Sequence, residues 1–258
     1  MSIISTDDKL DILSVLKNFK TIALEEMDSV KLMDRTDKKF VFNRSLLPNI
    51  LHQIETHYSV LEINNIILNR YETLYFDSPD FFLYNEHHRG KSSRYKVRSR
   101  KYVDSNLYFF EVKFKTNKGR TIKNRIKLKN IDTQLNDESL RFLQSVSPLN
   151  ASNLQAKLWS NCTRITLVNI QSKERLTLDI DLQFKNETQE INLSNIVIAE
   201  VKQEKAFAST FVDLMRKEKI KEGSISKYCM AVASLFNDVK KNNFKQKLNT
   251  LNKINHDF

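Results

Sequence analysis

Glycine is scarce in this sequence, which has only three glycines in 258 residues. Nucleotide-binding motifs of the GxxxxGK[ST] and GxGxxG kinds need several clustered glycines, so that backbone N–H groups can approach the phosphates. Gly90, Gly119 and Gly223 stand far apart, and neither motif is present. Any phosphate that this chain binds must therefore be held by side chains.

Cysteine and long hydrophobic runs are also lacking. The two cysteines, Cys162 and Cys229, form no CxxC pair, which argues against both a disulfide framework and a zinc site. No apolar run reaches the roughly 18 residues that a membrane-spanning helix needs. The first residues, MSIISTDDKLDILSVLKNF, carry acids and lack the basic start and apolar core of a signal peptide. We therefore expect a cytoplasmic protein that would reach the inner face of a membrane only through a partner.

The two signs of charge are unequal. The chain has 42 lysines and arginines against 31 aspartates and glutamates, which gives a formal net charge of +11. Such an excess favours a polyanionic partner, which could be nucleic acid, a phosphate ester or an anionic lipid. The apolar share of 40% is enough for a sizeable core, and no linker demands a second domain.

A regular row of cations lies within this excess. In SSRYKVRSRKY, residues 92–102, alternate positions carry Arg94, Lys96, Arg98 and Arg100, which we call the cationic ladder. A β-strand sends alternate side chains to opposite faces, so an extended chain would place these four charges on one face about 7 Å apart. Lys101 would then point the other way.

The hydrophobic pattern predicts a mixed α+β fold. Alternation with period two indicates strands at 35–43, 70–78, 162–168, 175–184 and 196–201, and a three-stranded antiparallel meander over 92–129. Helical spacing indicates helices at 9–19, 45–58, 132–146, 154–159, 207–219 and 225–237. The Lys/Asn-rich segment after residue 237 is expected to be frayed.

The polar positions of the predicted strands share one face. For any single strand, the ordinary interpretation of such a face is exposure to solvent. The predicted helices, however, need the apolar face of the sheet to pack on. The charged faces together would then form either one large open basic surface or, if the sheet closes, the lining of a tunnel. A tunnel of this kind would have to be wet and filled by an anion.

The motifs along the chain resemble those of the VTC domain, the polyphosphate polymerase module of the vacuolar transporter chaperone complex. They follow the family's order and include RTDKKFVF, RYKVRSRKY, FFEVKFK, IKNRIK, NCTRITL, RLTLDIDLQF, IAEVKQE and SISKYCMAVASL. The resemblance covers about residues 30–237, with an N-terminal helical segment at 1–29 and a C-terminal tail at 238–258. It implies the triphosphate tunnel metalloenzyme (CYTH-like) fold: α+β, an antiparallel β-barrel tunnel with a polar basic lumen, and helices packed outside.

The resemblance also implies a set of site residues. The family's phosphate-binding positions fall, motif by motif, on Lys39, Arg98, Arg100, Lys113, Lys123, Arg125, Arg164, Arg175 and Lys227. Of these, Arg98, Arg100, Lys113 and Lys227 are also expected to contact the nucleotide. The family's metal-binding glutamate falls on Glu200, and Glu111, in a similar EVK triplet, is a weaker candidate. Cys162 stands where the family often has tyrosine. The chain therefore lacks, at this position, a hydroxyl that could contact phosphate or base.

The activity implied by the resemblance is a Mn²⁺- or Mg²⁺-dependent polyphosphate polymerase. Such an enzyme transfers the terminal phosphoryl group of ATP to a growing inorganic polyphosphate chain and releases ADP. Two alternatives stay open: a triphosphatase of the same fold, and a non-catalytic polyanion-binding module. Triphosphatases typically show paired acidic ExExK motifs, and none occurs here, which favours the polymerase. The expected partners are ATP and polyphosphate rather than nucleic acid; a separately encoded membrane partner and the oligomeric state stay open.

Other polar and aromatic residues are expected to be structural. Asp179 and Asp181 should point inward with Arg175 and pair with cations, with a second metal contact as the alternative. His87 and His88 are expected to be a surface or packing pair, and Trp159 and the stretch YFDSPDFFLY are expected in the core. Lys227 follows Ser226 at a predicted helix start, where ordinary capping competes with anion binding by free N–H groups.

Overall fold

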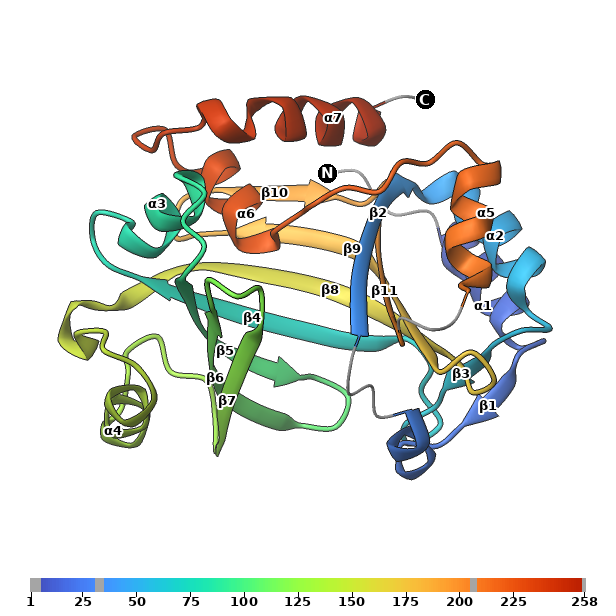
Figure 1. Cartoon of the computed structure of the whole chain (residues 1–258), viewed down its shortest axis with the longest axis horizontal. Coiled ribbons are helices and arrows are strands. Elements are labelled where there is room, and N and C mark those ends of the chain that lie inside the picture. Colours follow the sequence, from blue (N-terminus) through green and yellow to red (C-terminus); the bar gives the residue numbers. More distant parts are fainter. Residues whose placement is uncertain (1–5, 31–34, 205–207, 257–258) are drawn as a thin grey trace.

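A curved, mainly antiparallel sheet forms the centre of the molecule (Figure 1). The computed structural model describes residues 6–30, 35–204 and 208–256. Within them the strands are β1 (Lys20–Ile22), β2 (Arg35–Asn43), β3 (Ser59–Leu61), β4 (Asn69–Asp77), β5 (Arg94–Tyr102), β6 (Leu107–Lys115), β7 (Thr121–Leu128), β8 (Gln155–Asn169), β9 (Glu174–Lys185), β10 (Glu190–Leu193) and β11 (Ile196–Glu204). The main path of the sheet is β2-β11-β9-β8-β4-β5-β6-β7.

The helices lie before, between and after the strands. They are α1 (Thr6–Leu16), α2 (Leu47–Ile54), α3 (Phe82–His88), α4 (Asp137–Val146), α5 (Thr210–Lys217), α6 (Lys227–Leu235) and α7 (Lys245–His256), with short 3-10 turns at Glu25–Val30, Arg44–Leu46, Ala151–Asn153 and Asn242–Phe244. Among the described helices, none combines the length and the apolar character that crossing a bilayer requires.

The sheet curls into an open barrel. One end strand, β2, crosses in front of β8 and β9 in the view of Figure 1, and no hydrogen-bonded pairing joins it to the other end strand, β7, in the described part of the chain. The free edge of β2 is instead covered by the segment before α6, where the Gly223 N–H donates to the Lys39 carbonyl at 2.8 Å and Phe40 pairs with Glu222.

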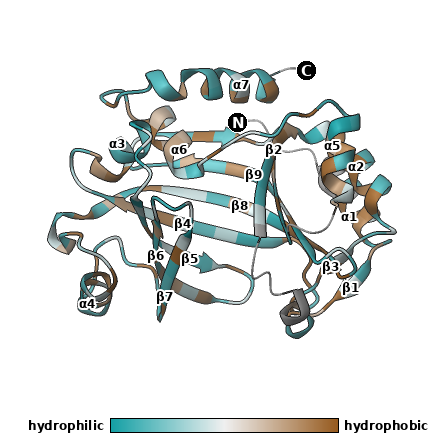
Figure 2. Cartoon of the chain, in the orientation of Figure 1, coloured by the Kyte–Doolittle hydropathy of each residue, from teal (hydrophilic) through white to brown (hydrophobic). Residues whose placement is uncertain are grey.

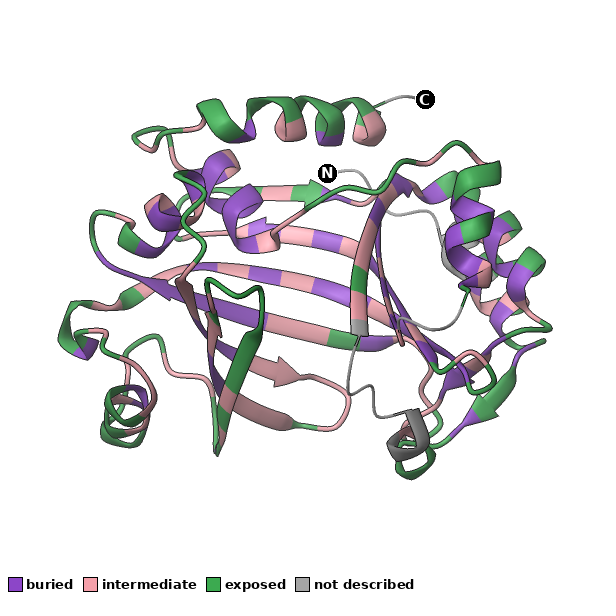
Figure 3. Cartoon of the chain, viewed as in Figure 1, coloured by how far each residue is buried: buried purple, intermediate pink, exposed green. Residues whose placement is uncertain are grey.

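Alternation gives the sheet two distinct faces. We call the side that carries the cationic ladder the inner face, and the opposite side the outer face. Along β8 and β9, buried and partly exposed residues follow one another (Figure 3). The outer face is apolar and is covered by helices. Helices α1, α2 and α5 pack on β2, β8, β9 and β11, and α4 packs on β4, β5, β6 and β7.

Helix α6 lies on the inner side of the sheet, at one end. Its Tyr228 ring packs 5.0 Å from the Tyr75 ring of β4. Ile198 of β11 belongs to the same apolar cluster, which also contains residues of α3 and α7. Because Tyr75 and Ile198 share a face with the charged residues of their strands, the inner face is apolar where α6 covers it and charged elsewhere. The charged part of the inner face therefore begins at the N-terminus of α6.

The fold class predicted from the sequence is confirmed. Two segments, residues 154–159 and the C-terminal segment, differ from the prediction. The antiparallel sheet, the meander β5-β6-β7 and the outer helices are as expected; the predicted start of a helix at residue 207 lies outside the described residues. The segment 154–159, predicted to be helical, opens β8 instead, because Leu158 and Trp159 face opposite sides of the sheet.

The C-terminal segment, predicted to be frayed, contains the ordered helix α7. The helix is mostly hydrophilic, with hydrophobic residues at intervals along it (Figure 2). These residues, Leu248, Leu251 and Ile254, recur every three residues and pack on the cluster around α6. Asn43 of β2 also donates from its side chain to the Ile254 carbonyl at 2.7 Å. Tertiary contacts thus stabilise a helix that the composition of the segment did not predict.

Shortening Leu251 should destabilise the protein if α7 is part of the folded unit. The Leu251 side chain is only 5% exposed, so Leu251→Ala removes buried methyl groups and leaves a cavity. We expect the free energy of unfolding, measured by urea denaturation, to fall by about 2–3 kcal/mol. The neighbouring Asn252 is exposed, and Asn252→Ala should change the free energy by less than about 0.5 kcal/mol. Equal, small effects of both variants would show that the segment is frayed in solution.

Candidate functional site

The cationic ladder occupies the inner face of β5, and its neighbours extend it across two more strands. The register places Arg98 of β5 opposite Glu111 of β6, and Glu111 opposite Arg125 of β7. Lys96 likewise stands opposite Lys113, which stands opposite Lys123. On the inner face of β5, β6 and β7, cations therefore outnumber carboxylates, and Glu111 is the one acid.

Glu111 is held between two of these cations. Its carboxylate accepts from the Arg98 Nε at 2.6 Å and lies 2.5 Å from the Arg98 Nη2, and its other oxygen lies 2.7 Å from the Lys123 Nζ. The side chain is completely buried. Burial alone would raise the pKa of Glu111, but Arg98, Arg100 and Lys123 together hold it well below its usual range. Glu111 is therefore an ionised internal counter-ion.

Asp179 of β9 holds a second pair of cations. Its carboxylate accepts two hydrogen bonds from Arg164 of β8, at 2.6 and 2.8 Å, and lies 2.5 Å from the Lys227 Nζ. Burial raises the pKa of Asp179, and Arg164 and Lys227 more than reverse this, so the pKa lies well below its ordinary value. Lys227 is the first residue of α6, so this contact ties the helix N-terminus to the sheet.

Glu200 of β11 lies between a third pair. Its carboxylate is 3.2 Å from the Lys202 Nζ and 3.6 Å from the Lys39 Nζ of β2. Burial would raise its pKa, but Lys202 and Lys39 lower it to about 2. Unlike Glu111, this side chain is 21% exposed, and its contacts with the lysines are longer. Glu200 is thus an ionised carboxylate that remains accessible from the inner face.

Arg100 and Lys113 stand outside these three groups. Arg100 donates to the Thr73 hydroxyl at 3.1 Å, and its guanidinium lies 5.3 Å from the Tyr71 ring. Among the described residues, no carboxylate lies within ion-pair distance of Lys113, and the positive charge of Arg98, followed by burial and Arg100, lowers its pKa to about 5. A lysine held neutral by neighbouring cations would gain its proton when an anion binds beside it.

The remaining predicted residues lie at the sides of this cluster. Arg125 is exposed on β7, with its guanidinium 4.5 Å from the Phe109 ring. Arg175 of β9 stands opposite Lys202, beyond the Glu200 group. The structure therefore brings together the predicted residues Lys39, Arg98, Arg100, Lys113, Lys123, Arg164, Lys227, Glu111 and Glu200, and leaves Arg125 and Arg175 peripheral.

Electrostatic coupling links the Asp179 group to the Glu200 group and to Arg100. Arg164 lowers the pKa of Glu200 on β11 and that of Arg100 on β5. Lys96 of β5 also donates to the Ser226 hydroxyl at 2.9 Å, across the inner face. The sequence reasoning missed this contact of Lys96, although the Ser226 cap preceding Lys227 was a usable signal. The Ser226 hydroxyl also accepts a hydrogen bond from the Cys229 N–H. Ser226 therefore caps the helix and contacts Lys96 of the inner face at the same time.

Asp181 departs from the predicted alternation. Its backbone has φ of 52°, in the left-handed region, and the β8–β9 register is irregular near Asn161 and Thr163. The Asp181 carboxylate lies 2.5 Å from the Arg44 Nη1 rather than beside Asp179. Only Asp179 of this pair therefore reaches the cation cluster. In the described part of the chain, no three His, Cys, Asp or Glu side chains gather in a way that could hold a metal ion by themselves.

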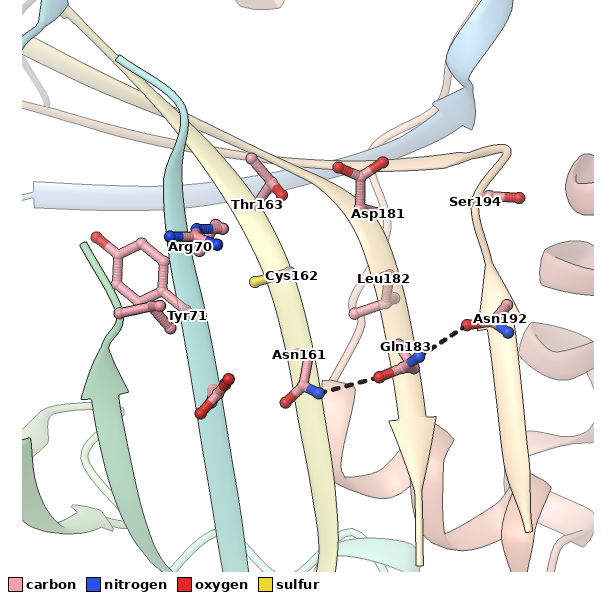
Figure 4. Close-up of a pocket in the computed structure, with 12 residues that line it drawn as sticks. Arg70, Tyr71, Asn161, Cys162, Thr163, Asp181, Leu182, Gln183, Asn192 and Ser194 are labelled. Carbon is pink, nitrogen blue, oxygen red and sulfur yellow. Dashed lines mark hydrogen bonds between the residues drawn. The ribbon is translucent and has the colours of Figure 1, made fainter. Parts of the chain in front are cut away.

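A cavity lies at these strand irregularities, beside the charge cluster. It measures about 390 Å³ and is lined by residues of β4, β8, β9 and β10 (Figure 4). A hydrogen-bonded row of amides crosses it, in which Asn161 donates to Gln183 at 3.0 Å and Gln183 donates to Asn192 at 3.1 Å. None of the predicted phosphate-binding residues lines it. The charge cluster on the inner face is therefore the stronger candidate site.

Comparisons with known proteins show the family of the chain and support its fold. The model of the VTC domain family matches residues 34–236. A solved candidate adenylate cyclase from Bacillus halodurans is similar at 15% identity and a TM-score of 0.51, over 80% of this chain and 100% of that one. A candidate adenylyl cyclase from Hippeastrum, with a dominant triphosphatase activity, has 12% identity and a TM-score of 0.47 over 80% and 98% of the two chains. The Bacillus halodurans likeness supports the fold alone, and no curated protein matches the sequence.

Binding of inorganic triphosphate should take up protons through Lys113. Its pKa of about 5 leaves it mainly neutral at pH 7, and a bound anion would raise that pKa, so binding should tighten as the pH falls toward 5. Calorimetry at pH 7 in buffers of different ionisation enthalpy should show more proton uptake by the wild type than by Lys113→Met. Lys115→Met, which changes an exposed lysine on the same face of β6, is the matched control. Identical proton uptake by the wild type and Lys113→Met would contradict this role.

Proposed function

The chain belongs to the VTC domain family, and from this we propose that it is a polyphosphate polymerase. The reaction transfers the γ-phosphoryl group of ATP to the terminal phosphate of an inorganic polyphosphate chain and releases ADP. An oxygen of the terminal phosphate forms the new P–O bond, and the bond between the β- and γ-phosphates of ATP breaks. Such a reaction requires mainly that the protein position two polyanions and neutralise their charge.

The observation that carries the proposal is the charge balance on the inner face. Glu111, Asp179 and Glu200 each lie between two cations, so every one of these groups keeps a net positive charge. Arg100 and Lys113 add cationic groups without a carboxylate at ion-pair distance in the described structure. An extended polyanion would replace the missing negative charge along the whole face. A compact substrate with a single anionic group would not.

The arginines and lysines would share this task. Arg98, Arg100 and Arg164 present planar guanidinium groups, which can bind phosphate through two parallel hydrogen bonds. Lys39, Lys113 and Lys227 act as point charges from three different elements, β2, β6 and α6. Together they would hold the γ-phosphate and the end of the acceptor chain in line. Lys227 approaches from the α6 side, where it can reach a phosphate that the sheet residues already hold.

The implied cofactor, Mn²⁺ or Mg²⁺, fits the residues at Glu200. These hard cations bind through one or two carboxylates and complete their shell with phosphate oxygens and water, so a single accessible carboxylate suffices. Glu200 is ionised and partly exposed on the inner face. Glu111 fits less well, because it is completely buried and Arg98 and Lys123 occupy both of its oxygens. Glu200 would hold the ion, which would supply positive charge to offset the negative charge that develops during transfer.

The decisive test is incubation of the protein with ATP and Mn²⁺, with nucleotides and product length measured separately. The proposal expects ADP together with a long polymer that an exopolyphosphatase digests. Release of free phosphate without polymer would indicate the triphosphatase alternative. Salt-sensitive binding of polyphosphate with no ADP release would indicate a non-catalytic polyanion-binding module.

Glu200→Gln should abolish turnover while it leaves polyphosphate binding nearly intact. We expect the rate to fall by about 100-fold or more, as for the loss of a single transition-state contact. Arg100→Ala should weaken both binding and rate, because it removes a phosphate contact. Glu204→Gln is the matched control, since Glu204 lies on the same face of β11 at its far end, beside Lys173. Normal polymerisation by both Glu200→Gln and Arg100→Ala would refute these roles.

A further inference from the structure

Aromatic rings replace the cations at one end of the inner face. Along β5 the inner positions end with Tyr102, and along β6 they begin with Leu107 and Phe109. The register places Phe109 opposite Arg100, and Tyr102 opposite Tyr71 of β4. Three rings therefore adjoin the last arginine of the cationic ladder. Of the three rings, Tyr71 still packs against the cluster around α6, and Tyr102 and Phe109 lie beyond it.

Tyr102 and Phe109 are not explained by packing of the core. Both are half-buried, and neither belongs to any of the apolar clusters of the described structure. Tyr102 meets Tyr71 at 4.9 Å with the planes tilted by 57°, and meets Phe109 edge-on at 5.7 Å and 81°. Because neither contact is a parallel stack, neither covers a full face of the Tyr102 ring. An aromatic surface thus remains available on a face that is otherwise charged.

The rings also touch residues of the phosphate-binding set. Arg125 lies 4.5 Å from the centre of Phe109, and Arg100 and Arg164 lie 5.3 and 5.0 Å from that of Tyr71. A ligand in contact with these rings would therefore meet guanidinium groups at once. Guanidinium planes and aromatic rings are the two kinds of surface on which nucleobases stack. Inorganic polyphosphate has no group that would use the rings.

We propose that Tyr102 and Phe109 form a stacking platform for the purine base of a nucleoside triphosphate. The inference rests on the proposed function and adds the orientation of the nucleotide. Tyr102 stands four residues from Arg98, a distance of roughly 13 Å along the strand. A base on the platform would therefore place its phosphates along Arg100, Arg98 and Lys113, with the γ-phosphate deepest. Since stacking reads no hydrogen-bonding pattern, adenine and guanine nucleotides should bind about equally.

The test compares two ligands that differ only by the nucleoside. Binding of a non-hydrolysable ATP analogue and of inorganic triphosphate is measured by calorimetry for the wild type, Tyr102→Leu and Phe109→Leu. Stacking of one base contributes about 1–3 kcal/mol, so each variant should bind the analogue roughly tenfold more weakly and triphosphate with unchanged affinity. Tyr102→Trp should retain analogue binding, which guards against a loss through misfolding.

Tyr95→Leu is the matched control. Tyr95 lies on the outer face of the same hairpin and stacks on Phe114 at 4.4 Å and 20°, so its loss removes a comparable ring contact away from the inner face. Equal weakening of both ligands by Tyr102→Leu and Phe109→Leu would show that the rings only position the arginines, and would overturn the platform. Unchanged binding of both ligands would overturn it too. If the wild type binds both ligands but makes no polymer, the proposed polymerase activity is refuted, whereas the stacking platform is not.

Discussion

Repulsion between like charges on a concave surface is the constraint on which the rest of this structure depends. The inner face gathers cations from β2, β5, β6, β7, β8, β9, β11 and α6, and like charges on one face repel one another. The protein answers with three carboxylates, each placed between two cations. This ratio lowers the repulsion while it leaves a net positive charge. The lowered pKa of Lys113 shows the repulsion that remains without a bound anion.

The same ion pairs also join parts of the fold that backbone hydrogen bonds leave separate. The barrel is open between β2 and β7 in the described residues, and the segment that leads into α6 covers the edge of β2. From there, Lys227 reaches Asp179 on β9 and Ser226 accepts from Lys96 on β5. Side-chain contacts of α6 thus bridge the two halves of the sheet. Binding of an anion at Lys227 would compete with a contact that also holds the helix in place.

The alternation of polar and apolar residues was enough to predict the sheet, the meander and the face on which the cations lie. This works because side chains of a strand point to opposite faces with a strict period of two. It failed at Asp181, since one residue with positive φ shifts the side chains and sends this acid to Arg44. The helical spacing of residues 154–159 misled because Leu158 and Trp159 pack on opposite faces of β8. Helix α7 escaped prediction because its stability comes from contacts with the α6 cluster rather than from its own composition.

The two EVK triplets show why motif resemblance alone cannot assign a metal ligand. Glu111 and Glu200 are each followed by Val and Lys and both face inward, yet their cross-strand partners differ. Glu111 stands opposite Arg98 and Arg125, and short contacts with Arg98 and Lys123 bury it completely. Glu200 stands opposite Lys39 and Thr177, and its lysines contact it at longer distances and leave it partly exposed. A divalent ion could bind Glu200 while Lys39 and Lys202 turn to phosphate, whereas at Glu111 it would leave a buried arginine without its counter-ion.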